Sequence, residues 1–351
     1  MKTNGLLLQQ IATVAAFWVL TITGACAQTI VKTRPAGFMP YTLAQNATAS
    51  VGFPLTETPA FVGPVLSFTT NAIQAGGVAW TPGQFAVAGA PYFVAITSGQ
   101  QVGRILPVTT NTTDTLTLDT GDTGLDASGF TLVTGATADT FELFAGYTLG
   151  TFFGTTAISG VLPSGIQGGT SAFTADGVQI YNGVKFVTFF FNTTVNAWTM
   201  VNGGTTDQTN TILPPGQGLL ITRRGPTATL WLAGRVPSTS LLTKLPNAST
   251  TAVSVRFPTD TTLAGLAFSG PGTWIQSNSI FTADSVNLWN GIKWVPYFKN
   301  TGGVWNVLNG GTADQGATVI PAGTAVLIIK RGTTNSGPST FFSEALPYSL
   351  N

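Results

Sequence analysis

Residues 173–187 read FTADGVQIYNGVKFV, and residues 281–295 read FTADSVNLWNGIKWV. These stretches match at an offset of 108 residues, and NGGTTDQ at 202–208 then matches NGGTADQ at 309–315 at an offset of 107. Recurrence of several blocks in one order is the mark of a repeated structural unit. We therefore predict two copies of one unit, with the one-residue change of offset lying in the loop before Trp198.

The matched blocks have the composition of β-strands. Short runs of Val, Ile, Thr and aromatic residues are broken by Gly, Asn, Asp and Pro, which is typical of strands joined by tight turns. Asn182-Gly183 and Asn290-Gly291 each separate two such runs, and this predicts hairpins in which both turn residues have positive φ. The only helix we expect is a short one at 148–153. The sequence thus predicts an all-β protein.

Two other features recur in both blocks. Trp198 and Trp305 are counterparts and are expected in the cores of the two copies. Each copy also has a basic pair after an apolar run, Arg223-Arg224 in one and Lys330-Arg331 in the other. We expect one side chain of each pair to reach solvent and the other to pair with a carboxylate.

The repeat sets the predicted domain boundaries. Residues 1–27 are interpreted as a signal peptide and 28–147 as an N-terminal β domain. Two copies of a β-sandwich or barrel-like unit follow, at 148–245 and 246–351. The Ser-, Thr- and Pro-rich stretch around residues 237–251 is the expected linker between the copies.

The N-terminus has the pattern of an export signal. Lys2 is followed by an apolar stretch at 11–22 and then by Ala25-Cys26-Ala27, with small residues at the cleavage positions before Gln28. The alternatives are lipidation of Cys26 and an ordinary buried helix. We expect a secreted or cell-envelope protein, in the periplasm or on the outer surface.

Composition excludes several classes of site. The 351 residues include 14 Lys or Arg, 13 Asp or Glu, no His and one Cys. A catalytic triad that uses His, a His-ligated metal, a zinc site made of cysteines and a disulfide framework are therefore excluded. A net charge of +1 gives no field that would attract nucleic acid. Short runs interrupted by Pro disfavour an outer-membrane barrel.

Four further blocks carry a family resemblance. They are YFVAITSG at 92–99, NTTDTLTL at 111–118, YTLGTFFG at 147–154 and PPGQGLLITRR at 214–224. Together they resemble a family of exported proteins of Verrucomicrobia-like bacteria that has no known activity. The resemblance implies export and a bacterial envelope setting, and it brings no catalytic residue.

Four aspartates are the best candidates for carboxylate catalysis. Asp176 and Asp207 in the first copy match Asp284 and Asp314 in the second. A glycosidase would need two such groups across one bond. We expect instead that all four bond to local backbone N–H groups in turns, and that Asp207 and Asp314 also pair with the basic residues. The sequence therefore predicts no enzyme and no catalytic residues.

An acidic loop is the candidate metal site. Residues 119–126 read DTGDTGLD and place Asp119, Asp122 and Asp126 on a Gly-containing turn. Calcium prefers several oxygen ligands, although this spacing does not match an EF-hand. The alternative is a solvated turn between two strands, and we predict no cofactor other than this possible calcium ion.

Aromatic residues are the candidate ligand-binding groups. Tyr181, Phe186, Trp289 and Trp294 flank the two predicted hairpin turns. Flat aromatic faces can stack on sugar rings, whereas aromatics on one face of a strand pair usually pack against one another. Exposure of Trp289 and Trp294 would favour sugar binding, and their burial would favour a structural role.

These observations predict a non-catalytic structural or adhesive protein of the bacterial envelope or extracellular matrix. A carbohydrate-binding module that uses exposed aromatics is the alternative, and an enzyme with carboxylate chemistry ranks third. The expected partners are a polysaccharide, an envelope surface or further copies of the chain.

Overall fold

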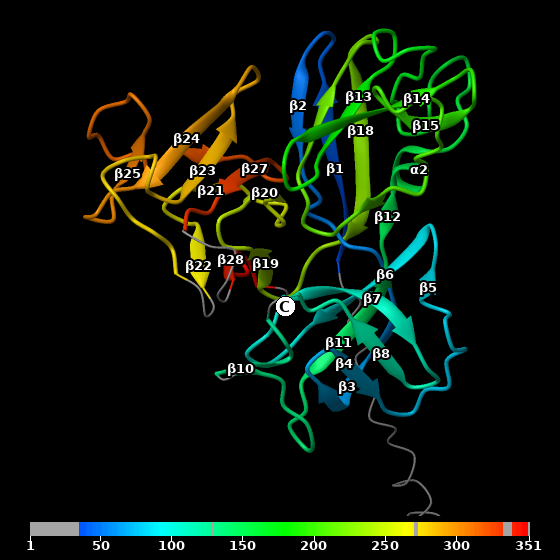
Figure 1. The fold of residues 1–351 in the computed structure, drawn as a ribbon, viewed down its shortest axis with the longest axis vertical. Helices are drawn as coiled ribbons and strands as arrows, with labels where there is room; N and C mark the ends of the chain where they lie inside the picture. The colour runs from blue at the N-terminus through cyan, green and yellow to red at the C-terminus, as the bar shows by residue number, and fades with distance from the viewer. Residues whose placement is uncertain (1–34, 122, 128, 270–272, 333–338, 350–351) are drawn as a thin grey trace, which may run out of the picture. The chain divides into compact units, whose positions relative to one another are not determined.

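Strands dominate this chain, and the predicted all-β class is confirmed. Of the residues that the structure describes, 45% lie in strands and 2% in helix. The computed structural model (Figure 1) describes residues 35–121, 123–127, 129–269, 273–332 and 339–349. The predicted signal peptide, including Cys26, lies outside these residues. The expected short helix is α2 (Leu149–Phe153), which begins where the Thr148 hydroxyl accepts the N–H of Thr151 at 3.2 Å.

The first five-stranded sheet is antiparallel and buries Trp198 completely. Each of its strands is only four to seven residues long, because Gly, Asn or Pro interrupts the β-forming runs. Its strand order is β15 (Ala197–Met200), β14 (Phe186–Asn192), β13 (Gly177–Tyr181), β17 (Leu219–Thr222) and β2 (Thr48–Val51).

A second five-stranded sheet has the same strand order. Trp305, the counterpart of Trp198, is buried in its core. Phe191 pairs with Trp198 in the first sheet and Lys299 pairs with Trp305 in the second, so the change of offset lies in the turn before each Trp, as predicted. The order is β25 (Trp305–Val307), β24 (Trp294–Lys299), β23 (Ser285–Trp289), β27 (Ala325–Ile329) and β20 (Thr250–Ser254).

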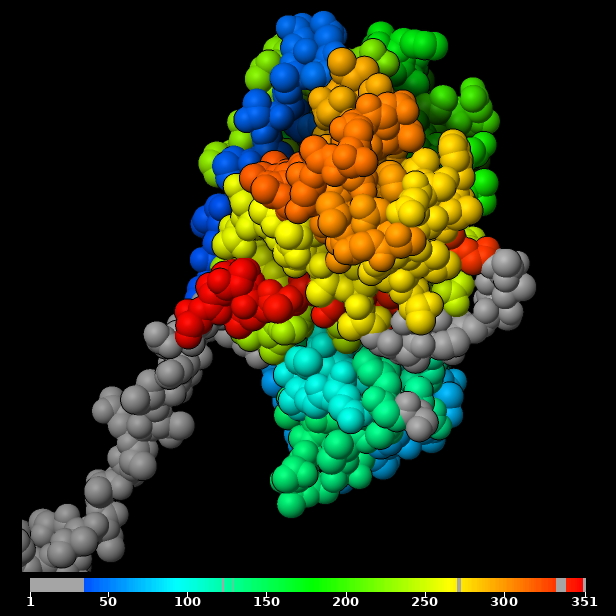
Figure 2. All heavy atoms as spheres, turned by 90° about the vertical axis from the view of Figure 1, so that its left-hand side faces the viewer, coloured from blue at the N-terminus to red at the C-terminus, as the bar shows by residue number. Residues whose placement is uncertain are grey.

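Smaller sheets complete two matching units. The first unit comprises β1, β2 and β12–β18, and the second unit comprises β19–β28. Figure 2 shows the second unit, coloured from yellow to red. The smaller sheets pair β1 (Ala36–Leu43) with β18 (Ala228–Arg235), β12 (Tyr147–Thr148) with β16 (Ile212–Leu213), β21 (Thr261–Thr262) with β26 (Val319–Ile320), and β19 (Leu241–Leu245) and β22 (Ala267–Ser269) with β28 (Thr340–Glu344).

The two hairpin turns differ from the prediction in their backbone angles. Gly183 and Gly291 have φ of 93° and 96°, whereas neither Asn182 nor Asn290 has positive φ. Each Asn uses its side chain instead: Asn182 Oδ1 accepts the N–H groups of the residues two and three positions later, and Asn290 does the same. The expectation of two positive φ angles was wrong, because the Asn side chain closes the turn.

A closed barrel forms the remaining part of the described chain. Its six antiparallel strands pair in the order β3-β4-β8-β7-β6-β11, and the pairing of β11 with β3 closes the barrel. Register shifts in β3, β7 and β11 mark β-bulges, which help a sheet bend and close. The strands are β3 (Pro59–Thr69), β4 (Ala72–Ala75), β8 (Thr115–Leu118), β7 (Ile105–Asn111), β6 (Ala90–Ile96) and β11 (Thr140–Ala145), with β5 (Ala86–Val87) beside β6 and β9 (Asp126–Ala127) paired with β10 (Phe130–Thr131).

The barrel interrupts the first unit rather than preceding it. Strands β1 and β2, which come before the barrel in sequence, pair with β18 and β17, which come after it. The second unit joins β20 to β21 through residues 255–260, and the first joins β2 to β12 through residues 52–146. The strand pairing therefore differs from the predicted division at residue 147: residues 36–51 belong with the first unit.

Candidate functional site

Asp176 and Asp284 hold equivalent buried positions in the two units. Both are 0% exposed. Asp176 forms an ion pair with Arg223 and accepts the backbone N–H groups of Gln167 at 2.7 Å and Arg224 at 2.6 Å. The carboxylate oxygens are thus committed to internal partners, and the group is poorly placed to reach a substrate.

Asp284 repeats this arrangement with a lysine. It pairs with Lys330 and accepts the N–H groups of Ile275 and Arg331, each at 2.6 Å. The basic pairs at the ends of β17 and β27 therefore meet these buried aspartates. The expected pairing with Asp207 and Asp314 was wrong.

Asp207 and Asp314 lie in turns, as predicted. Asp207 accepts the N–H of Thr209 at 2.7 Å, and hydrogen bonds from Thr209 lower the pKa of this carboxyl below its usual range. Asp314 accepts the N–H of Gly316 at 2.8 Å. Both contacts close local turns.

Two aspartates of the acidic loop accept hydrogen bonds from nearby residues of the chain. Asp119 accepts the N–H of Gly121 at 3.1 Å, and Asp126 accepts the Thr70 hydroxyl at 2.8 Å. Asp122 lies outside the described residues. Within the described ranges, no three His, Cys, Asp or Glu side chains gather as a metal site would require.

The four candidate aromatics form one cluster, and each is half-buried. Ring centroids lie 5.2 Å apart for Tyr181 and Phe186, 6.0 Å for Phe186 and Trp294, and 5.4 Å for Trp294 and Trp289. The indole N–H of Trp289 donates to the carbonyl of Thr48 at 2.9 Å. The hairpins of the two units thus meet through equivalent residues.

One pair of backbone contacts between the units is reciprocal. Gly52 donates its N–H to the carbonyl of Gly323 at 2.6 Å, and Ser254 donates to Gly216 at 2.8 Å. Gly323 is the repeat counterpart of Gly216, and the registers of β2 and β20 make Ser254 the counterpart of Gly52. Phe186 and Trp294 are likewise counterparts, and their ring planes are stacked with an angle of 11° between them. The contact therefore resembles an isologous interface, in which the same surface patch of each unit meets its equivalent about an approximate two-fold axis.

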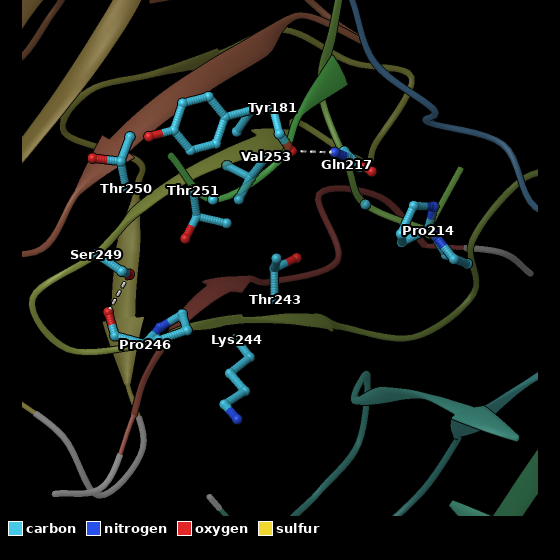
Figure 3. Close-up of a pocket in the computed structure, with 14 residues that line it drawn as sticks. Tyr181, Pro214, Gln217, Thr243, Lys244, Pro246, Ser249, Thr250, Thr251 and Val253 are labelled. Carbon is cyan, nitrogen blue, oxygen red and sulfur yellow. Dashed lines mark hydrogen bonds between the residues drawn. The ribbon is translucent and has the colours of Figure 1, made fainter. Parts of the chain in front are cut away.

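A cavity of about 370 Å³ opens on one side of this interface (Figure 3). We call it the interface cavity. It is lined by Tyr181 at the end of β13, by the loop that contains Pro214–Gln217, by residues of β19 and β20, and by the turn between those two strands. Gln217 holds the Tyr181 wall by donating to its carbonyl at 3.0 Å. The lining side chains with hydroxyl groups are Tyr181, Thr243, Ser249, Thr250 and Thr251.

One hydroxyl group of the cavity lining is buried without a hydrogen-bond partner among the described residues. Thr243 Oγ1 is buried and makes no hydrogen bond with the described residues, whereas Ser249 donates to the carbonyl of Pro246 at 2.5 Å. Sequence reasoning identified Tyr181 but missed Thr243 and Thr250, because their segment has the composition of a linker. A buried polar atom without a partner costs about 1–3 kcal/mol, so the Thr243 hydroxyl favours a bound ligand or water.

A buried charged pair lies near the interface in the second unit. Arg256 donates its backbone N–H to Glu344 Oε1 at 2.9 Å, while Arg256 Nη2 and Glu344 Oε2 have no hydrogen-bond partner among the described residues. Burial raises the pKa of Glu344 to about 7, although Arg256 acts in the opposite direction, and burial lowers the pKa of Arg256 to about 10. No sequence motif pointed to this pair, whose members are far apart in the chain.

The comparisons with known proteins supply no relative. Protein-family models, curated proteins and solved structures all gave no match to this chain. Among the helices of the described residues, none has the length and apolar character to cross a membrane.

Proposed function

We propose that this protein is a non-catalytic, exported structural or adhesive component of the bacterial envelope or extracellular matrix. The observation that carries the proposal is a set of large apolar side chains exposed at equivalent positions of both units. Phe173 and Phe281 are 87% and 78% exposed, and Val184 and Ile292 are 83% and 85% exposed.

Repetition of these residues supports a role at the surface. A buried residue present in both units is explained by packing, as for Trp198 and Trp305. Phe173 and Phe281 have no such explanation, because most of each side chain is in water. An apolar side chain gains about 1.5–3 kcal/mol when it becomes buried, so four such side chains can anchor the protein to a surface or to another copy.

The contacts of the four candidate aspartates support a non-catalytic role. Asp176 and Asp284 are bound in ion pairs, and Asp207 and Asp314 close turns. Sugar stacking on Trp289 and Trp294 receives less support, because these two rings are half-buried and contact one another.

Binding to envelope material tests the adhesive role. We expect the purified protein to bind isolated envelope or polysaccharide fractions or to self-associate. Phe173→Ser with Phe281→Ser should weaken the interaction at least tenfold, since two exposed anchors are lost. Leu66→Ser with Val87→Ser is the matched control, because both residues are exposed and apolar but lie in the barrel. Equal binding by the two double variants would contradict the proposal.

Export is tested separately. Mass spectrometry of the protein from its native host should give an N-terminus at Gln28. A mature chain that retains Met1, or one with a diacylglyceryl group on Cys26, would overturn the proposed processing.

A further inference from the structure

We infer that the interface cavity is a binding site for a neutral saccharide. This inference goes beyond the adhesive role, because none of the exposed residues Phe173, Val184, Phe281 and Ile292 lines the cavity. It follows from comparing the two sides of the interface, which the repeat makes equivalent.

On the side opposite the cavity, which we call the closed side, two aromatic side chains donate hydrogen bonds to carbonyl groups. Trp289 donates its indole N–H to the carbonyl of Thr48 at 2.9 Å, and Tyr41 donates its hydroxyl to the carbonyl of Gly52 at 2.8 Å. Tyr41 also reaches the carbonyl of Gly323 at 3.3 Å. The fold thus places two flat rings, each with a donor at its edge, against acceptors of β2 and the segment that follows it.

On the open side, both aromatic side chains have smaller counterparts. Tyr181 is the counterpart of Trp289, and the registers of β1 and β19 make Thr243 the counterpart of Tyr41. The positions that correspond to Thr48 and Gly52 are Thr250 and Ser254. Tyr181 is smaller than Trp289, and Thr243 is smaller than Tyr41. We attribute the cavity to these two differences in side-chain size.

A ligand that fits here must resemble what the closed side contains. It must be flat enough to lie against Tyr181 and must carry donors at its edge. A pyranose ring meets these requirements, because its axial C–H groups form an apolar face and its hydroxyls both donate and accept. The hydroxyls of Thr243, Thr250 and Thr251 suit such a ligand, and the buried Thr243 Oγ1 supplies an acceptor or donor without an internal partner.

The charge of the cavity favours a neutral ligand. Among the described residues that line it, none carries a carboxylate and Lys244 is the one with a charged side chain. Figure 3 shows the Lys244 amino end directed away from Tyr181, while Thr243 and Thr251 lie toward the Tyr181 side. The volume falls within the range of about 300–1,000 Å³ that is usual for small-molecule sites.

The test places the aromatic residues of the closed side at the equivalent positions of the cavity, so that they fill it. Saturation-transfer NMR and calorimetry on the full chain would use glucose, galactose, mannose, N-acetylglucosamine and their β-linked disaccharides as probes. At least one saccharide should bind with 1:1 stoichiometry. Tyr181→Trp with Thr243→Tyr should weaken that binding at least tenfold without lowering the melting temperature.

A second pair of variants decides the outcome if the filled cavity impairs folding. Thr243→Val removes only the hydroxyl and should weaken binding at least threefold. Thr199→Val is its matched control, since Thr199 Oγ1 is also buried without a partner but lies in β15 outside the cavity, and it should leave binding unchanged. Failure of every saccharide to bind, binding that survives the changes at Tyr181 and Thr243, or binding of indole in place of saccharides would overturn the inference.

Discussion

The first and second units share a strand order but differ at one connection. Residues 255–260 join β20 to β21, whereas the whole barrel joins the equivalent strands β2 and β12. The barrel can occupy that connection because its own ends are adjacent: Pro59 at the start of β3 pairs with Phe144 at the end of β11. A domain with neighbouring ends can be inserted into a surface loop without disturbing the fold around it.

The units also differ in how they fill their common interface. On one side Trp289 and Tyr41 donate to carbonyl groups, and the side with Tyr181 and Thr243 holds a cavity. The two sides therefore differ at two pairs of equivalent positions, Trp289 and Tyr181, and Tyr41 and Thr243. The candidate site lies on the side with the smaller residues. One pair of backbone contacts is reciprocal, but Gly218 donates its N–H to the carbonyl of Ala252 whereas its counterpart Ala325 donates to the Ser50 hydroxyl, so the two sides differ in backbone contacts as well as in side chains.

The largest expected effect comes from breaking the buried ion pairs. Asp176→Asn leaves Arg223 buried without its counter-charge and should lower the free energy of unfolding by about 3–5 kcal/mol. Asp284→Asn should act in the same direction through Lys330. Urea denaturation measures both effects, with Asp207→Asn as the exposed control, which should change stability little. A small effect of Asp176→Asn, comparable with that control, would show that the pair does not stabilise the first unit.

A smaller effect is expected from a feature that only the second unit has. Glu344 pairs with Leu241 as Leu232 pairs with Met39, so the first unit has Leu232 where the second has a buried acid. The pKa of Glu344 is raised from 4.5 to about 7 by burial. The folded state therefore keeps a proton that the unfolded chain releases, and this contribution to stability is fully present below pH 4.5 and is lost as the pH rises to 7.

The expected size of this pH-dependent loss is about 3 kcal/mol. The measurement is the free energy of unfolding from pH 4.5 to pH 8 for the wild type and for Glu344→Gln. The difference between the two curves should change across this window and become constant above it. Parallel curves would mean that Glu344 titrates alike in the folded and unfolded chains.

Sequence reasoning succeeded where the signal was local. The β class, the helix at 149–153 and the burial of Trp198 and Trp305 all follow from short patterns and from comparison of the two copies. The turn at Asn182-Gly183 was located but its geometry was not, because the Asn side chain competes with the backbone for the turn's N–H groups.

Features that depend on distant segments could not be predicted. The place of β2 beside β17 is hidden because residues 52–146 intervene. Phe53-Pro54 follows β2 and Phe257-Pro258 follows β20, but a match of two residues is too short to reveal the equivalence. The interface cavity is also built from distant segments, and only Tyr181 among its residues carried an aromatic signal. Thr243 has no distinctive sequence context, since a single Thr becomes informative only when its buried hydroxyl lacks a partner.

The smallest expected effect tests the equivalence of the two hairpins. Gly183 and Gly291 have φ of 93° and 96°, and a Cβ at either position would meet nothing within 4 Å. Gly→Ala at each site therefore changes backbone strain without a clash and should cost about 1 kcal/mol. Equal losses, measured by urea denaturation, are expected because the backbones match. A loss at Gly183 that clearly exceeds the loss at Gly291 would show that the hairpin beside the cavity is held more rigidly than its counterpart, and the equivalence of the two hairpins would then fail.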